Sequence, residues 1–145
     1  MIGLVQRVSQ ANVIVDNQII GEISQGMVVL LGVEKNDAEA EIEKLANKLC
    51  NYRMFSDEDG KMNLNIRQVS GEMLVVSQFT LVADTQKGNR PGFSKGASPE
   101  HGKKMYALFI ASLKNKGIKV ATGEFGADMK VALVNDGPVT FQFQV

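Results

Sequence analysis

Apolar and polar residues alternate along the opening part of the chain, a pattern typical of β-strands that bury one face. Four strand-like segments follow one another with short polar turns between them: residues 2–8, 11–15, 19–23 and 27–33. The fourth segment is a continuous apolar run, which indicates a strand that is covered on both faces. The chain therefore begins with several strands joined by short turns.

Two later segments show the 3.6-residue period of amphipathic helices. Their apolar positions are Ile42, Leu45, Ala46 and Leu49 in the first, and Met105, Leu108, Phe109 and Leu113 in the second. The first helix is expected over residues 37–52, with Asn36 and Glu39 as a capping box. The second starts at Ser98-Pro99, where serine is a good N-cap and proline suits the first helical position, and it stops at Gly117.

The rest of the chain adds strand-like runs at residues 54–55, 73–79, 118–121, 129–134 and 140–145. In the second of these, alternation places Ser77 and Phe79 on one face and Gln78 and Thr80 on the other. No linker, composition shift or internal repeat divides the chain. We therefore expect residues 1–145 to form a single mixed α/β domain, with two main helices on its sheet.

Charge is balanced over the whole chain but not along it. Sixteen basic residues match sixteen acidic ones, so no global attraction to nucleic acid exists. Residues 85–104 nevertheless contain five cations and one acid, Glu100; the cations are Lys87, Arg90, Lys95, Lys103 and Lys104. This basic stretch around Phe93 suits either a polyanion backbone or an ordinary solvated loop.

The usual catalytic and metal-binding groups are almost absent. The only histidine, His101, falls in the first turn of the second helix, where we expect a solvated side chain and not a base. The only cysteine, Cys50, fits a buried helical position, which excludes an internal disulfide and a cysteine cluster. We expect no metal and no cofactor.

The N-terminal residues lack the apolar centre of a signal peptide. The longest apolar run, at residues 27–33, is far shorter than a membrane span. We therefore expect a cytoplasmic protein without a membrane partner.

Residues 135–140, Asn-Asp-Gly-Pro-Val-Thr, lie between two strand-like runs. Asp-Gly in this position usually forms a tight hairpin. Pro138 opposes that, because it pushes Gly137 towards extended geometry and removes a backbone donor. Two interpretations stay open: an ordinary loop before an edge strand, or a Gly-Pro corner with exposed carbonyl groups and a cis peptide bond.

A second segment of interest is the polar end of the apolar strand, Ser77 to Leu81. Strand ends in α/β proteins are common ligand sites, because side chains and free backbone N–H groups converge there. The same pattern also fits polar side chains that only cap a strand. Neither hydroxyl in this segment has a neighbouring base that would make it a nucleophile.

Together, these two segments resemble the signature motifs of the D-aminoacyl-tRNA deacylase family: Ser-Gln-Phe-Thr-Leu at residues 77–81 and Asn-Asp-Gly-Pro-Val-Thr at residues 135–140. The similarity covers the whole chain, including the opening Met-Ile-x-Leu-Val-Gln-Arg-Val, Arg-Pro-x-Phe-Ser-Lys-Gly-Ala at residues 90–97, and Ala-Asp-Met at residues 127–129. Neither motif departs from the family pattern.

The resemblance implies a carboxylic-ester hydrolase that releases free D-amino acid and tRNA from D-aminoacyl-tRNA, and that also removes glycine mischarged on alanine tRNA. Such an enzyme proofreads the chirality of charged tRNA. The resemblance further implies a homodimer that binds tRNA, but not DNA. Its fold would have three layers, β/β/α, with two mixed or antiparallel sheets.

For the Gly-Pro corner, the resemblance implies a cis peptide between Gly137 and Pro138 that enters the active site of the partner subunit. The two backbone carbonyls would accept the substrate α-amino group and leave no room for an L side chain. An ammonium group is a pure donor, so carbonyl acceptors suit it. Arg7 would support the orientation of the corner.

For the other motif, the resemblance places Phe79, Phe125 and Met129 around the terminal adenine, which suits stacking and a thioether contact. The backbone at Phe79 and Thr80, with Gln78 nearby, would face the scissile carbonyl and its developing oxyanion.

Several mechanisms and functions stay open. The tRNA 2′-OH would assist the attacking water, or Thr80 or Ser77 would act as a covalent nucleophile. A different class of function is a non-catalytic RNA-end-binding module that uses the basic loop and Phe79. A third is a dimerisation protein whose Gly-Pro corner only shapes an interface. Preferred D-amino acids and tRNAs do not follow from the sequence.

Overall fold

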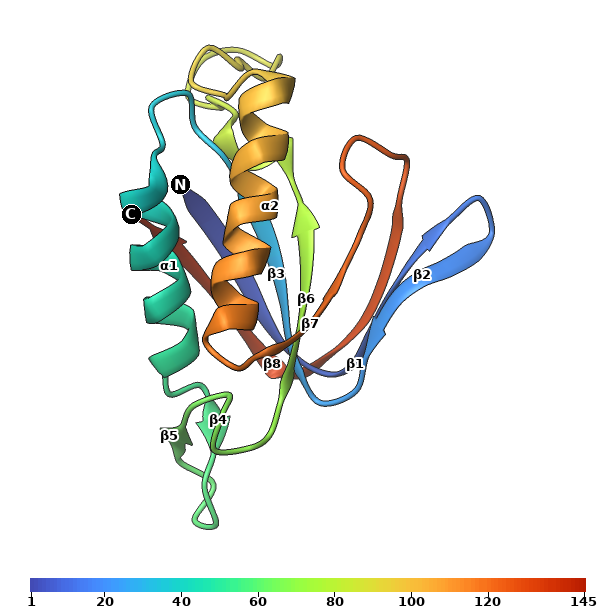
Figure 1. Ribbon diagram of the computed structural model, residues 1–145, viewed down its shortest axis with the longest axis vertical. Coiled ribbons are helices and arrows are strands. Elements are labelled where there is room, and N and C mark those ends of the chain that lie inside the picture. Colours follow the sequence, from blue (N-terminus) through green and yellow to red (C-terminus); the bar gives the residue numbers. More distant parts are fainter.

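A computed structural model describes residues 1–145, and its longest strands form one bent framework (Figure 1). The two segments predicted at residues 2–8 and 11–15 are one strand, β1 (Ile2–Val15). Its first half pairs with β3 (Gly26–Gly32) and its second half with β2 (Gln18–Ile23), both antiparallel. Along its other edge runs β8 (Lys130–Gln144), with shifts in register midway.

The central sheet is mixed and has six strands, in the order β2-β1-β3-β6-β7 with β8 on β1. The strands β6 (Glu72–Ser77) and β7 (Lys119–Thr122) run parallel to β3. Each parallel step is made through a helix, first α1 (Glu39–Asn51) and then α2 (Pro99–Asn115). A second, two-stranded sheet consists of β4 (Phe55–Ser56) and β5 (Met62–Leu64).

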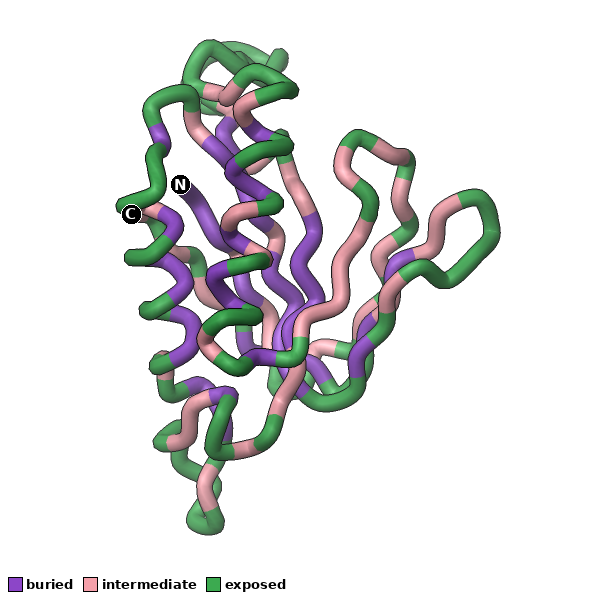
Figure 2. Tube along the Cα trace, in the orientation of Figure 1, coloured by how far each residue is buried: buried purple, intermediate pink, exposed green.

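Alternate residues of β3 and β6 enter two separate cores, which explains the continuous apolar runs in the sequence. Met27 of β3 and Val75 of β6 pack with the helices, whereas Val28 and Leu74 pack against the second half of β1. Figure 2 shows the buried positions concentrated along these central strands. The molecule thus has helices, central strands and a curled strand layer, which confirms the expected single-domain β/β/α fold.

The curled layer almost closes on itself. Gly21 of β2 lies so close to β7 that a Cβ at this position would overlap the Thr122 carbonyl oxygen. One six-stranded sheet therefore supplies both β layers, in addition to the small β4–β5 sheet. The structure therefore contains two sheets, as predicted, but both β layers of the three-layer fold belong to the six-stranded sheet.

Three local predictions need correction. The predicted capping box of Asn36 and Glu39 is not formed: the N-cap of α1 is Ala38, which has no side-chain acceptor, and only its N–H is capped, by the Glu41 carboxylate over 2.8 Å. The runs 129–134 and 140–145 belong to a single strand, β8. The strand predicted at 73–79 ends at Ser77, because Phe79–Val82 forms a 3₁₀ helix, η1.

The third correction changes the site, because a 3₁₀ turn abolishes the strand alternation of side chains after Ser77. The N–H of Leu81 donates to the Gln78 carbonyl over 3.2 Å, and that of Ala83 to the Thr80 carbonyl over 3.2 Å. The prediction that Phe79 and Ser77 lie on the same face of one strand is therefore wrong.

The ends of α2 are confirmed. The Ser98 hydroxyl accepts a hydrogen bond from the His101 N–H over 3.2 Å, with Pro99 at the first helical position. Gly117 follows the helix with φ +81°, the left-handed conformation that favours glycine.

Cys50 is fully buried, as its helical position predicts. Neither helix is long and apolar enough for a membrane crossing.

Candidate active site

A pocket of about 420 Å³ opens where three elements meet: the C-terminal end of β6, the N-terminal half of α2 and the β7–β8 loop (residues 123–129). Figure 1 shows this loop beside the upper part of α2. The wall is mostly apolar and consists of Leu31, Val33, Ser77, Gln78, Phe79, Ala97, Ser98, Pro99, Gly102, Tyr106, Phe125, Gly126, Ala127 and Met129. The C-terminal ends of parallel strands are a frequent ligand position.

Aromatic rings form part of the pocket wall. Phe79 is 50% exposed, and its ring stacks on Phe93 with 4.8 Å between centroids and 29° between planes. A Cβ at Gly96 would come within 2.6 Å of the Phe79 ring, so this glycine makes room for it. The Phe125 and Tyr106 rings also line the pocket, with 5.9 Å between their centroids. Such flat apolar walls suit a planar ligand.

Polar groups lie at the rim, at the first turn of η1. The Gln78 side chain donates from Nε2 to the Thr80 hydroxyl over 2.6 Å. The backbone N–H groups of Phe79 and Thr80 are the first two of a 3₁₀ helix, and therefore have no acceptor within that helix. Thr80 itself is exposed and does not line the pocket.

The wall contains no side chain that can act as a base at neutral pH. Its only ionisable group is Tyr106, whose hydroxyl donates to the Val75 carbonyl over 2.8 Å. Burial raises the pKa of Tyr106 to about 12, so the phenol keeps its proton. His101 lies elsewhere, with Nε2 2.9 Å from the Asp37 carbonyl oxygen.

The Gly-Pro corner is held by side chains on both sides of it. Asn135 spans the turn: its Oδ1 accepts from the Val139 N–H over 2.7 Å, and its Nδ2 donates to the Val139 carbonyl over 3.2 Å. From β1, Arg7 donates through Nε to the Asp136 carbonyl over 2.7 Å and through Nη1 to the Met54 carbonyl over 2.9 Å. The corner is thereby fixed to the framework of the sheet.

The peptide bond between Gly137 and Pro138 is cis, as the resemblance implies, and both residues are exposed. None of residues 135–140 lines the pocket. Within one chain, the structure therefore brings together the pocket residues Ser77, Gln78, Phe79, Phe125 and Met129, and keeps Arg7, Gly137 and Pro138 away from them.

Sequence reasoning missed several parts of this site. Tyr106 was given no role, although its hydroxyl donates to the Val75 carbonyl at the end of β6. Ser98 and Pro99 were recognised only as a helix start, yet they also form the pocket wall. A tyrosine among the apolar residues of the second helix was the available signal, because a buried phenol needs a hydrogen-bond partner. No cluster of three or more His, Cys, Asp or Glu side chains is placed to hold a metal ion.

Comparisons with known proteins agree along the whole chain. A family model described as "D-Tyr-tRNA(Tyr) deacylase" matches residues 4–144. A protein of Alteromonas mediterranea named D-aminoacyl-tRNA deacylase is 75% identical over the full length of both chains, and one of Pseudoalteromonas atlantica with the same name is 61% identical over the same extent.

Two solved structures share the fold. One, described as "c-Myc DNA Unwinding Element Binding Protein", has a TM-score of 0.94 and 38% identity, over 100% of this chain and 99% of the other. A second, "Structural Analysis of a probable eukaryotic D-amino acid tRNA deacylase", has a TM-score of 0.88 and 14% identity, over 99% of this chain and 98% of the other. At that identity, the second likeness concerns the fold alone.

Proposed function

This chain belongs to the D-aminoacyl-tRNA deacylase family, and from that premise we propose how its pocket handles the substrate. The chain is a hydrolase that deacylates D-aminoacyl-tRNA. This activity argues against the two alternative functions, a non-catalytic RNA-binding module and a protein that only dimerises. We propose that the apolar pocket receives the terminal adenosine and that ester hydrolysis takes place at its rim.

The adenine ring would stack between Phe79 and Phe125, with Met129 as a soft contact. The half-exposed Phe79 ring and the Phe125 ring line the same pocket, which supports this placement. The ribose and the ester would then lie at the pocket rim, near Gln78 and the start of η1.

In the chemical step, water adds to the ester carbonyl and the bond to the ribose 3′-oxygen breaks, which releases the free D-amino acid and the tRNA. The negative charge that develops on the carbonyl oxygen needs donors, and the N–H groups of Phe79 and Thr80 are suited to supply them. Gln78, held on the Thr80 hydroxyl, would orient this turn.

One observation carries the mechanism: the pocket wall offers no group that can take a proton from water, because Tyr106 has a pKa of about 12. We propose that the 2′-OH of the terminal ribose orients the attacking water in place of a protein base. Ser77 lines the pocket and is the competing candidate, as a covalent nucleophile.

Selection between D- and L-amino acids is proposed to come from a second copy of the chain in a homodimer. The Gly137 and Pro138 carbonyls would accept hydrogen bonds from the substrate ammonium, and crowd out an L side chain. The corner is exposed and lies outside its own pocket, which supports action on the partner's site. Glycine has no side chain that the corner could exclude, so glycine mischarged on alanine tRNA would also be removed. We place the enzyme in the cytoplasm, where tRNA is charged.

The proposal is tested by deacylation assays with D-Tyr-tRNA and L-Tyr-tRNA. The purified protein should deacylate the D form and spare the L form; equal rates on both would refute chiral selection. Replacing the terminal ribose by its 2′-deoxy form should abolish turnover, whereas Ser77→Ala and Thr80→Ala should retain it. A trapped acyl-enzyme on Ser77 or Thr80 would instead establish covalent catalysis.

A further inference from the structure

The long loop between η1 and α2 places a second exposed aromatic ring directly beside the pocket. Phe93 is 36% exposed and stacks on Phe79, but it is not part of the pocket wall. A ring that only covered Phe79 would bury its own apolar surface and that of its neighbour. Here both rings remain accessible, and they form a continuous stacking surface that leads out of the pocket.

The loop holds Phe93 in a defined position, because backbone hydrogen bonds tie it down on both sides. Asp84 and Gly92 exchange two hydrogen bonds, of 2.7 and 3.0 Å. After Phe93, the Gly96 N–H donates to the Phe93 carbonyl over 3.0 Å, and the Ala97 N–H to the Val33 carbonyl over 3.1 Å. A preorganised ring loses little conformational freedom when a ligand binds to it.

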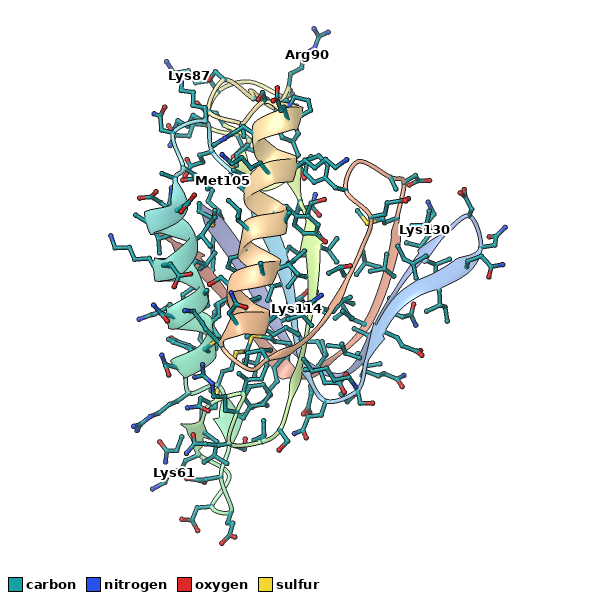
Figure 3. The ribbon with its side chains drawn as sticks, in the orientation of Figure 1. Lys61, Lys87, Arg90, Met105, Lys114 and Lys130 are labelled. Atoms are coloured by element: carbon teal, nitrogen blue, oxygen red, sulfur yellow. The ribbon has the colours of Figure 1, made fainter.

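Exposed cations without an ion pair lie on the loop that carries Phe93 and on the first turns of α2. Residues 84–104 contain five cations but only two carboxylates, those of Asp84 and Glu100, although the whole chain has no net charge. None of the five forms an ion pair within the chain; they are Lys87, Arg90, Lys95, Lys103 and Lys104. Figure 3 shows Lys87 and Arg90 extending from the end of the molecule that carries the loop, opposite to Lys61.

An aromatic platform beside unpaired cations is the arrangement that binds single-stranded nucleic acid, by base stacking and by contact with phosphates. We infer that Phe93 stacks the nucleotide that precedes the terminal adenosine, and that Arg90 and its neighbouring lysines contact the adjoining phosphates. The ligand class is the unpaired 3′ end of an RNA. This inference rests on the proposed placement of the adenosine in the pocket, and it adds a second nucleotide subsite outside it.

The subsite is tested with two competitive inhibitors of D-Tyr-tRNA deacylation, adenosine 5′-monophosphate and the dinucleotide CpA. The wild-type protein should bind CpA at least about fivefold more tightly, the lower end of what one stacked base contributes. Phe93→Ala should remove that advantage and leave the inhibition constant of the monophosphate unchanged, and Phe93→Trp should keep it.

Three results separate the possible failures. Equal affinities of the wild-type protein for both inhibitors would overturn the subsite. A Phe93→Ala variant that loses both inhibitors equally would also overturn it, because Phe93 would then only support Phe79. If neither compound inhibits, or if D-Tyr-tRNA is not turned over, it is the proposed function that fails.

The electrostatic part is tested by the salt dependence of KM for D-Tyr-tRNA. Arg90→Ala should reduce the slope of log KM against log salt concentration by about 0.7, the value for one phosphate contact in a single strand. Lys61→Ala, at the opposite end of the molecule, is the matched control and should leave the slope unchanged. Equal slopes for Arg90→Ala and the wild type would exclude a phosphate contact at Arg90.

Discussion

Tyr106 illustrates how a single residue can serve the site without taking part in its chemistry. Its hydroxyl donates to the Val75 carbonyl, which also accepts from the Gly123 N–H over 3.2 Å. Strand β6, helix α2 and the start of the β7–β8 loop are thus joined at one oxygen atom. Because Phe125 lies on that loop, Tyr106 positions the pocket wall.

We predict a pH-dependent contribution of Tyr106 to stability. Its pKa is raised from 10.0 to about 12, so folding favours the neutral phenol. The stabilisation is complete below pH 10 and is lost as the pH rises through 12. Urea unfolding of the wild type and of Tyr106→Phe should therefore differ by a constant free energy at neutral pH, and by less between pH 10 and pH 12. A difference independent of pH over that range would contradict the buried, protonated phenol.

Arg7 is a second residue whose contacts lead to a prediction, because it ties the Gly-Pro corner to the sheet. Its guanidinium reaches the Asp136 and Met54 carbonyls from one position, which the point charge of a lysine cannot reproduce. Arg7→Lys should therefore lower the free energy of unfolding by about 1–2 kcal/mol. It should also lower D-Tyr-tRNA deacylation by about tenfold, because the Gly-Pro corner is displaced.

Arg53→Lys is the control, since Arg53 is exposed and has no hydrogen bond or ion pair through its side chain. Chemical denaturation and single-turnover assays of both variants measure the two effects. Wild-type behaviour of Arg7→Lys in both assays would show that Asn135 alone holds the corner.

At the scale of elements, the close approach of β2 to β7 decides the shape of the curled layer. Both strands lie at the ends of the sheet path, and Gly21 lets them meet at the Thr122 carbonyl. The second core, which contains Val13, Ile23 and Leu74, is enclosed by this contact. Met129, on the pocket side, packs against the same core.

Gly21→Ala should therefore separate β2 from β7 and destabilise the protein by about 1–3 kcal/mol, the usual cost of overpacking. Gly92→Ala serves as a control, because its Cβ would meet only ordinary contacts, at 3.7 and 3.8 Å. Thermal and urea unfolding compare the two variants. An equal effect of both substitutions would mean that the β2–β7 contact is not tightly packed.

At the scale of the whole molecule, the pocket and the Gly-Pro corner are separate in one chain, so the proposed mechanism requires two copies for a complete site. A two-fold dimer would contain two such sites, each with a pocket from one subunit and a corner from the other. In this proposed arrangement, activity would be a property of the dimer and not of the single chain.

Mixing two inactive variants tests it. In Gly137→Ala, the new Cβ would lie 2.6 Å from the Val139 nitrogen, so the corner must shift. In Ala127→Trp, the large side chain would fill the pocket. Each variant alone should be inactive, but their mixture should regain about a quarter of wild-type activity after reassortment, because half of the dimers are mixed and each has one intact site. Co-purified mixed dimers without activity would contradict action in trans.

Local patterns in the sequence were sufficient for much of the fold. The helical stripe through Leu45 and Leu49, the Ser98 cap and the Gly117 stop all depend on neighbours a few residues away. Alternation identified the strands for the same reason. The pairing of the two signature motifs likewise led to the family, and the family resemblance led to Phe79, Phe125 and Met129 as pocket residues.

Tertiary structure decided the rest, because the deciding partners are remote in sequence. Strand β6 ends at Ser77, and the next residue, Gln78, donates its N–H to the Leu31 carbonyl of β3 over 2.7 Å before the 3₁₀ turn begins. The continuity of β1 depends on β8, more than a hundred residues later. Only the folded chain places Phe93 on Phe79, raises the pKa of Tyr106, and keeps the Gly-Pro corner out of its own pocket. The sequence alone determined the elements and the motifs, whereas long-range packing determined which of them meet.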